Sequence, residues 1–198
     1  KIMSSPKVEL DHDKHIYRVD GKIRPGISEL IRGSGILKGV VYGSEEALWR
    51  GKVIHKALEY LNKGTLDWDT VDESVIPYLR AYQKFLADTG FKPKSWEISL
   101  FNPTLKYCGT YDVEGECNGE KWLIDTKTGL TSLALGSWVG IQTAAQCLLL
   151  QDPTQYKRFG LKITSESKYN LVPYTDLNDY NAFIAIIALR NWRKNHNE

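Results

Sequence analysis

Apolar residues recur every three or four positions in two segments of the first half of the chain, as expected for amphipathic helices. The segment 44–64 begins with a capping serine and two acids, ends in glycine, and has its apolar positions at Ala47, Ile54, Leu58 and Leu61. The segment 72–90 has proline in its first turn and a stripe formed by Val75, Leu79, Tyr82 and Leu86. Both segments are predicted helices.

From residue 95 the pattern changes to the alternation typical of strands. Segments 95–101, 105–116 and 120–129 are predicted strands, and the dipeptide Asn118-Gly119 predicts a tight hairpin turn between the last two. The segment 137–151 is apolar on most sides, which predicts a largely buried helix. Segments 155–164 and 168–174 predict another hairpin, and 176–195 a C-terminal amphipathic helix capped by Asp176.

Near the N-terminus, residues 8–20 predict a small hairpin, and one or two helical turns follow from Ile27. The resulting order of elements predicts the α/β class, with one central mixed β-sheet flanked by helices. The chain has no internal repeat or linker. We therefore expect one domain over residues 1–198, with a hairpin and helical part at 1–92 and the sheet with the later helices at 93–198.

Composition narrows the classes of protein that fit. The formal net charge of the 198 residues is only +2, so any attraction to nucleic acid would have to come from local basic patches. The three cysteines are odd in number and lack C-x-x-C spacing, which argues against a disulfide framework or a zinc ribbon and favours a reducing compartment. No apolar run approaches the roughly 18 residues of a membrane span. We expect a soluble, cytoplasmic protein.

The triplet Asp125-Thr126-Lys127 ends an otherwise apolar strand. An acid two residues before a lysine is a weak signal, because 24 acids and 18 lysines produce about two such triplets by chance. The chain contains three, and those at residues 20–22 and 166–168 lie in polar, turn-like surroundings typical of ordinary surface. The triplet of Asp125 differs from the other two because it follows an apolar, strand-like segment.

Residues two apart on a strand share a face, so Asp125 and Lys127 point to the same side. A turn centred on 118–119 pairs position i with 237 minus i, which sets Asp112 opposite Asp125. Because like charges directly opposite are destabilising, this register predicts a cation between the two carboxylates, such as Mg²⁺ or Mn²⁺, with the Thr126 carbonyl as a further ligand. An incidental charged pair on an ordinary hairpin is the alternative.

Two helices carry further polar residues beside apolar ones. His55 lies at the edge of the apolar stripe of segment 44–64, where a histidine is often structural. Gln142 and Gln146 are four residues apart on the apolar helix 137–151, and buried amides require partners. The two amides could bond to each other or to the backbone.

Four segments occur in an order and approximate spacing that resemble the RecB-like branch of the PD-(D/E)XK nuclease superfamily. They are RGKVIHKALE, CGTYDVEG, WLIDTKTG and IQTAAQ. The chain resembles the small phage-type exonucleases of this branch and is similar to the mitochondrial genome maintenance exonuclease. The resemblance covers nearly the whole chain from about Tyr17 and implies a restriction-endonuclease-like core.

The resemblance also implies roles for individual residues. His55 would approach the metal site, Asp112 and Asp125 would bind the metal, Lys127 would be the catalytic lysine, and Gln142 would lie near the scissile strand. Glu97 matches a family glutamate, for which a structural ion pair is an equal alternative. The family tyrosine is replaced by Gln146, and the four cysteines that bind an iron–sulfur cluster in several relatives are missing, so we expect no such cluster.

These observations predict a deoxyribonuclease dependent on Mg²⁺ or Mn²⁺, acting as an exonuclease on DNA ends or single strands. DNA contacts are expected from two locally basic segments, at Arg50, Lys52 and Lys56 and at Tyr156, Lys157, Arg158 and Lys162. A structure-specific or restriction-type endonuclease and an inactive DNA-binding module of the same fold are the alternatives. A recombination or replication protein is a candidate partner, and the oligomeric state is left open.

Overall fold

The computed structural model describes residues 7–12, 14–37, 44–129 and 135–196. The first half of the chain holds a small sheet and the helices α1 to α3. Its elements are β1 (Val8–Asp11), β2 (Ile16–Val19), β3 (Lys22–Arg24), α1 (Ile27–Gly33), α2 (Glu45–Lys63), the 3₁₀ turn η1 (Trp68–Thr70) and α3 (Ile76–Thr89). The second half is β4 (Lys92–Asn102), β5 (Tyr107–Cys117), β6 (Glu120–Lys127), α4 (Ser137–Cys147), the 3₁₀ turn η3 (Pro153–Gln155), β7 (Tyr156–Ile163), β8 (Tyr169–Tyr174) and α5 (Asn178–His196).

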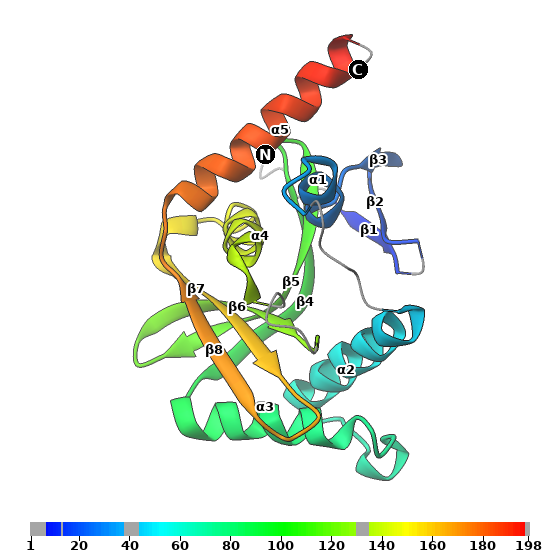
Figure 1. Cartoon of the computed structure of the whole chain (residues 1–198), viewed down its shortest axis with the longest axis vertical. Helices are drawn as coiled ribbons and strands as arrows, with labels where there is room; N and C mark the ends of the chain where they lie inside the picture. Colours follow the sequence, from blue (N-terminus) through cyan, green and yellow to red (C-terminus); the bar gives the residue numbers. More distant parts are fainter. Residues whose placement is uncertain (1–6, 13, 38–43, 130–134, 197–198) are drawn as a thin grey trace, which may run out of the picture.

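A five-stranded sheet in the order β4-β5-β6-β7-β8 forms the centre of the fold (Figure 1). Strands β6 and β7 are parallel and the other neighbours antiparallel, so the predicted mixed sheet is confirmed. The parallel pair needs a crossover, which α4 supplies between β6 and β7. The N-terminal hairpin is also confirmed, and β3 extends it to a separate three-stranded sheet.

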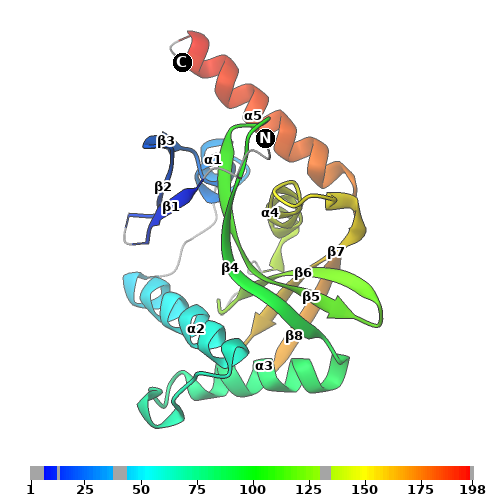
Figure 2. The same cartoon turned by 180° about the vertical axis from the view of Figure 1, so that it is seen from behind.

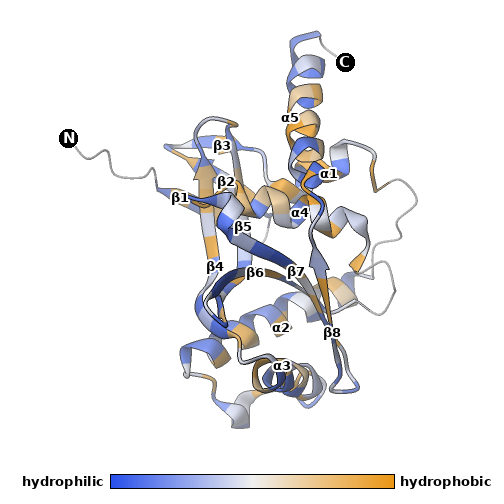
Figure 3. Cartoon of the chain, turned by 90° about the vertical axis from the view of Figure 1, so that its left-hand side faces the viewer, coloured by the Kyte–Doolittle hydropathy of each residue, from blue (hydrophilic) through white to orange (hydrophobic). Residues whose placement is uncertain are grey.

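Helices cover the central sheet on both sides, as Figures 1 and 2 show. Helices α2 and α3 pack with the sheet in one apolar cluster, whose fully buried members include Ile54, Leu79, Phe85 and Ile124. Helices α1, α4 and α5 form a second cluster around Tyr107. Hydrophilic and hydrophobic residues both occur along α2 and α3 (Figure 3), as predicted for amphipathic helices.

Local signals set the ends of these helices as predicted. The Ser44 side chain accepts a hydrogen bond from the Ala47 amide, and Gly64 and Gly90 end α2 and α3 in the left-handed conformation. Pro77 lies in the first turn of α3. The Asp176 carboxylate accepts a hydrogen bond from the Asn178 amide at the start of α5, at 2.8 Å.

The hairpin of β5 and β6 has the predicted register. Asn118 and Gly119 both have positive φ (51° and 80°), and five residue pairs obey the sum of 237, from Cys117 with Glu120 to Val113 with Ile124. The ladder ends at that last pair, immediately before Asp112. The three cysteines are buried and free, as expected without a disulfide framework.

Candidate metal and catalytic site

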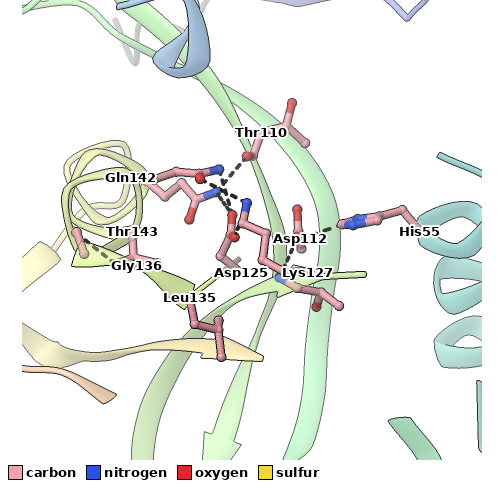
Figure 4. Close-up of polar contacts among 12 residues, drawn as sticks. His55, Thr110, Asp112, Asp125, Lys127, Leu135, Gly136, Gln142 and Thr143 are labelled. Carbon is pink, nitrogen blue, oxygen red and sulfur yellow. Dashed lines mark hydrogen bonds and ion pairs between the residues drawn. The ribbon is translucent and has the colours of Figure 1, made fainter. Parts of the chain in front are cut away.

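Strand β6 delivers an acid and a lysine side by side at its C-terminal end (Figure 4). The Asp125 side chain is 1% exposed, and the Lys127 ammonium lies 2.6 Å from its Oδ2. Lys127 Nζ also donates a hydrogen bond to Gln142 Oε1 at 3.0 Å and lies 5.0 Å from the ring centroid of Trp138. A buried carboxylate and two contacts from α4 therefore hold the ammonium in place.

Helix α4 binds the same carboxylate through both of its glutamines. The Nε2 atoms of Gln142 and Gln146 donate to Asp125 Oδ1 at 2.8 and 3.0 Å, and Gln146 donates also to the Thr110 carbonyl. The sequence left the partners of these amides open, and the structure places a carboxylate between them. Gly160, which pairs with Asp125 across β6 and β7, has no side chain, and a Cβ there would lie 2.6 Å from Leu135.

Asp112 turns towards α2, away from the glutamines (Figure 4). Its Oδ2 accepts a hydrogen bond from the Thr126 amide at 2.6 Å and lies 3.7 Å from His55 Nδ1. The two aspartates thus have separate partners, an imidazole and an amide for Asp112, and an ammonium and two amides for Asp125. Each carboxylate thus has partners from the protein itself, and the expected cation between the two aspartates stays a prediction.

Glu97 completes a cluster with Asp112 and His55. His55 Nδ1 lies 3.3 Å from Glu97 Oε1, and one ligand atom from each of the three residues lies within 4.8 Å of the others. Glu97 has φ of 51° inside β4, a strained conformation for a non-glycine residue and one that often occurs at functional sites. From the sequence, Glu97 was predicted only as a possible supporting residue, through its match to a family glutamate, with a structural ion pair as an equal alternative.

Burial and the charges of neighbouring groups shift the pKa values of His55 and Asp112. Burial opposes the charge on His55, but the Asp112 and Glu97 carboxylates outweigh it and raise the pKa of His55 to about 9. Burial also raises the pKa of Asp112 to about 7; His55 opposes this rise, and Asp125 and Glu97 add to it. The metal-free cluster therefore retains protons that the unfolded chain releases.

In EDTA, the free energy of unfolding should fall as pH rises from about 6.5 to 9. Native His55 holds its proton up to about pH 9, whereas unfolded His55, with its usual pKa of 6.5, releases it earlier. Native Asp112 adds to the fall only up to about pH 7, where it too releases its proton. Urea titrations at pH 6.5, 8 and 9 would measure the fall. For the double variant His55→Gln/Asp112→Asn, the free energy of unfolding should hardly change with pH over this range. If it fell as steeply with pH as that of the unchanged protein, the pH dependence would have another origin.

A small cleft of about 10 Å³, with room for roughly one water molecule, lies beside this cluster. It is bounded by α2, α3, β4, β5 and β6, and its lining residues include His55, Glu59, Glu97, Asp112 and Thr126. Asp125 and Lys127 are not among the lining residues. Thr126 lies between them in sequence and connects the two halves of the site through its hydrogen bond to Asp112.

The basic residues predicted to bind DNA lie in different environments. Lys52 and Lys56 are exposed on α2, and Arg50 pairs with Glu46 on the same helix. Lys162 pairs with Lys127 across the parallel strands and so lies near the site. Tyr156 and Lys157 pair with Lys121 and Trp122, roughly 10 to 13 Å along β6 from the Asp125 position.

Arg158 requires a correction. Its residue exposure is 4%, and its guanidinium donates to the carbonyls of Gly140 and Asp176 at 2.7 and 2.6 Å. It also pairs with Asp179 at 2.9 Å and lies over the ring of Tyr180. Because its donors are bound inside the fold, Arg158 joins α4, β7 and α5, and we exclude it from the DNA contacts.

No family model matches the chain, and a search of curated proteins finds no match either. Among solved structures, a candidate exonuclease from Eubacterium rectale is similar, with a TM-score of 0.53, 10% identity, and coverage of 86% of this chain and 79% of that one. The alkaline exonuclease LHK-Exo from Laribacter hongkongensis aligns with a TM-score of 0.31 and 13% identity over 87% of this chain and 92% of its own. At such identity the first likeness shows a shared fold, and the expected nuclease-like fold is confirmed. Within the described residues, none of the helices has the length and apolar character needed to span a membrane.

Proposed function

We propose that this protein is a divalent-metal-dependent nuclease of the PD-(D/E)XK type that hydrolyses phosphodiester bonds in DNA. One observation carries the proposal: two groups of polar side chains lie next to each other, linked by the hydrogen bond from the Thr126 amide to Asp112. His55, Glu97 and Asp112 lie on the α2 side, and Asp125 with Lys127 lies on the α4 side. The exonuclease names of the structural neighbours support the same reaction class.

The ligand atoms of the first group suit a divalent cation. Two carboxylates and one imidazole nitrogen, all within 4.8 Å of one another, match the preferences of Mn²⁺ and, through the carboxylates, Mg²⁺. Asp125 and the Thr126 carbonyl would complete the set on the β6 side. A cation bound there would supply a more acidic water and neutralise charge on the phosphate.

The protein's own residues would position the reactants. Lys127, held between Asp125 Oδ2 and Gln142 Oε1, presents an ammonium that orients the attacking water and stabilises charge on the phosphate. Gln142 contacts both members of the pair, so it couples the position of the lysine to that of the acid. Glu97 and Asp112 both approach Nδ1 of the His55 imidazole, at 3.3 and 3.7 Å, and so orient the ring.

The finer assignment is a RecB-like, phage-type exonuclease acting on DNA ends or single strands during replication or recombination. This assignment draws on the sequence resemblance. Lys52 and Lys56 are exposed on the helix that carries His55, and Lys162 is adjacent to Lys127, so a strand lying over the site would meet ammonium groups on two sides.

The test is cleavage of end-labelled linear DNA and of a covalently closed circle, in Mg²⁺, Mn²⁺ or EDTA. We expect the linear substrate to be degraded only with a divalent cation and the circle to survive. Cleavage of the circle would overturn the exonuclease assignment and favour an endonuclease. DNA binding without cleavage in either metal would overturn the nuclease proposal. Mn²⁺ binding, followed by electron paramagnetic resonance, should weaken at least tenfold in Glu97→Gln.

A further inference from the structure

Helix α2 carries an exposed row in which two aromatic side chains are interspersed with three lysines. The row consists of Trp49, Lys52, Lys56, Tyr60 and Lys63, all exposed. Their spacing of three or four residues places them on one face of the helix. Trp49 is 66% exposed and Tyr60 41%, whereas the packed side of α2 is formed by Ile54, Ala57 and Leu58. We call this row the α2 stripe.

Contacts with neighbouring side chains hold the lysines of the α2 stripe in place. Lys56 Nζ lies 5.0 Å from the ring centroid of Tyr60, and the Glu59 carboxylate binds the ammoniums of both Lys56 and Lys63. Glu59 is mostly covered, so it anchors the two lysines while their outer surfaces remain in solvent. Lys52 reaches the His12 carbonyl at 3.4 Å and carries its charge near Trp49 along the helix.

The stripe runs beside the candidate active site. On α2, the cleft is lined by His55, Leu58, Glu59 and Asn62. Helical spacing puts Glu59 next to both Lys56 and Lys63, so the cleft-lining row and the α2 stripe share an edge. A chain-like ligand lying along the stripe would therefore also pass over the mouth of the cleft.

We infer that the α2 stripe binds an unpaired nucleic acid strand, whose bases stack on Trp49 and Tyr60 while its phosphates contact the lysines. The inference rests on the proposed function and names its substrate class. Lysines alone would accept a duplex as well, but exposed flat rings gain stacking energy only where base faces are free. Eleven residues of helix separate the two rings by roughly 16 Å, which leaves room for a few nucleotides between them.

The experiment measures binding of fluorescein-labelled oligo(dT) and of a duplex of equal length, in EDTA, to protein carrying Lys127→Ala to prevent cleavage. Adding Trp49→Ala or Tyr60→Ala should weaken oligo(dT) binding about tenfold each, and duplex binding much less. Trp192→Ala, which removes a 49% exposed tryptophan from α5, is the matched control and should change neither. Lys52→Ala should lower the salt slope for oligo(dT) by about 0.7.

Equal losses for single strand and duplex, or no loss with folded variants of unchanged melting temperature, would overturn the inference. Its failure is separable from that of the proposed function. If the double variant Trp49→Ala/Tyr60→Ala, otherwise wild type, degrades single strands with an unchanged KM, the stripe is excluded as the binding surface and the proposed nuclease activity is retained. If oligo(dT) binds through the stripe but no metal supports cleavage, the nuclease is excluded and the binding surface remains.

Discussion

Lys127→Ala should lower kcat for DNA cleavage by about a thousandfold, because it removes the ammonium that would orient the attacking water and stabilise phosphate charge. The variant should fold with reduced stability, because Asp125 Oδ2 loses its ammonium partner while both glutamine amides still bind Oδ1. Single-turnover cleavage at saturating Mg²⁺ measures the effect directly, and a melting curve of the same sample shows whether the variant is folded.

Lys22→Ala is the matched control for this variant. Lys22 ends another acid-x-lysine triplet, in the turn between β2 and β3, and is exposed. The Lys22→Ala variant should cleave DNA at the same rate as the unchanged protein. If Lys127→Ala retained more than about a tenth of the rate, Lys127 would have no central role in the chemistry.

Arg158→Ala should lower the free energy of unfolding by about 3 kcal/mol or more. The change leaves the Asp179 carboxylate and the carbonyls of Gly140 and Asp176 without the guanidinium that binds all three. Urea unfolding followed by circular dichroism measures the loss. The DNA affinity of the protein that remains folded should be unchanged.

Lys157→Ala provides the comparison at the neighbouring position. Lys157 is exposed and pairs only at the surface with Glu120, so its removal should barely change stability. An Arg158→Ala protein as stable as the unchanged one but with weakened DNA binding would restore the role that the sequence first suggested for Arg158.

Local sequence determined much of the secondary structure. Serine and glycine at the ends of α2, proline in the first turn of α3, and the Asn118-Gly119 turn all act on residues within a few positions of themselves. A two-residue turn leaves one register for the strands beside it, so the pairing sum of 237 could be read from the sequence. Asp125 and Lys127 lie on the same face of β6 for an equally local reason, because residues two apart on a strand point to the same side.

Only the tertiary structure decided which partners those side chains have. Asp125 meets amides 17 and 21 residues away, His55 meets a glutamate 42 residues away, and Arg158 meets a carbonyl 18 residues away. The register of the hairpin turn placed Asp112 opposite Asp125, yet the ladder ends before them and Asp112 turns to α2. Helix and strand periodicity describes a face but does not say what packs against it. The cluster of His55, Glu97 and Asp112, the amide pair on Asp125 and the burial of Arg158 depend on how α2 and α4 pack against the sheet. That packing is set by contacts between residues distant in sequence.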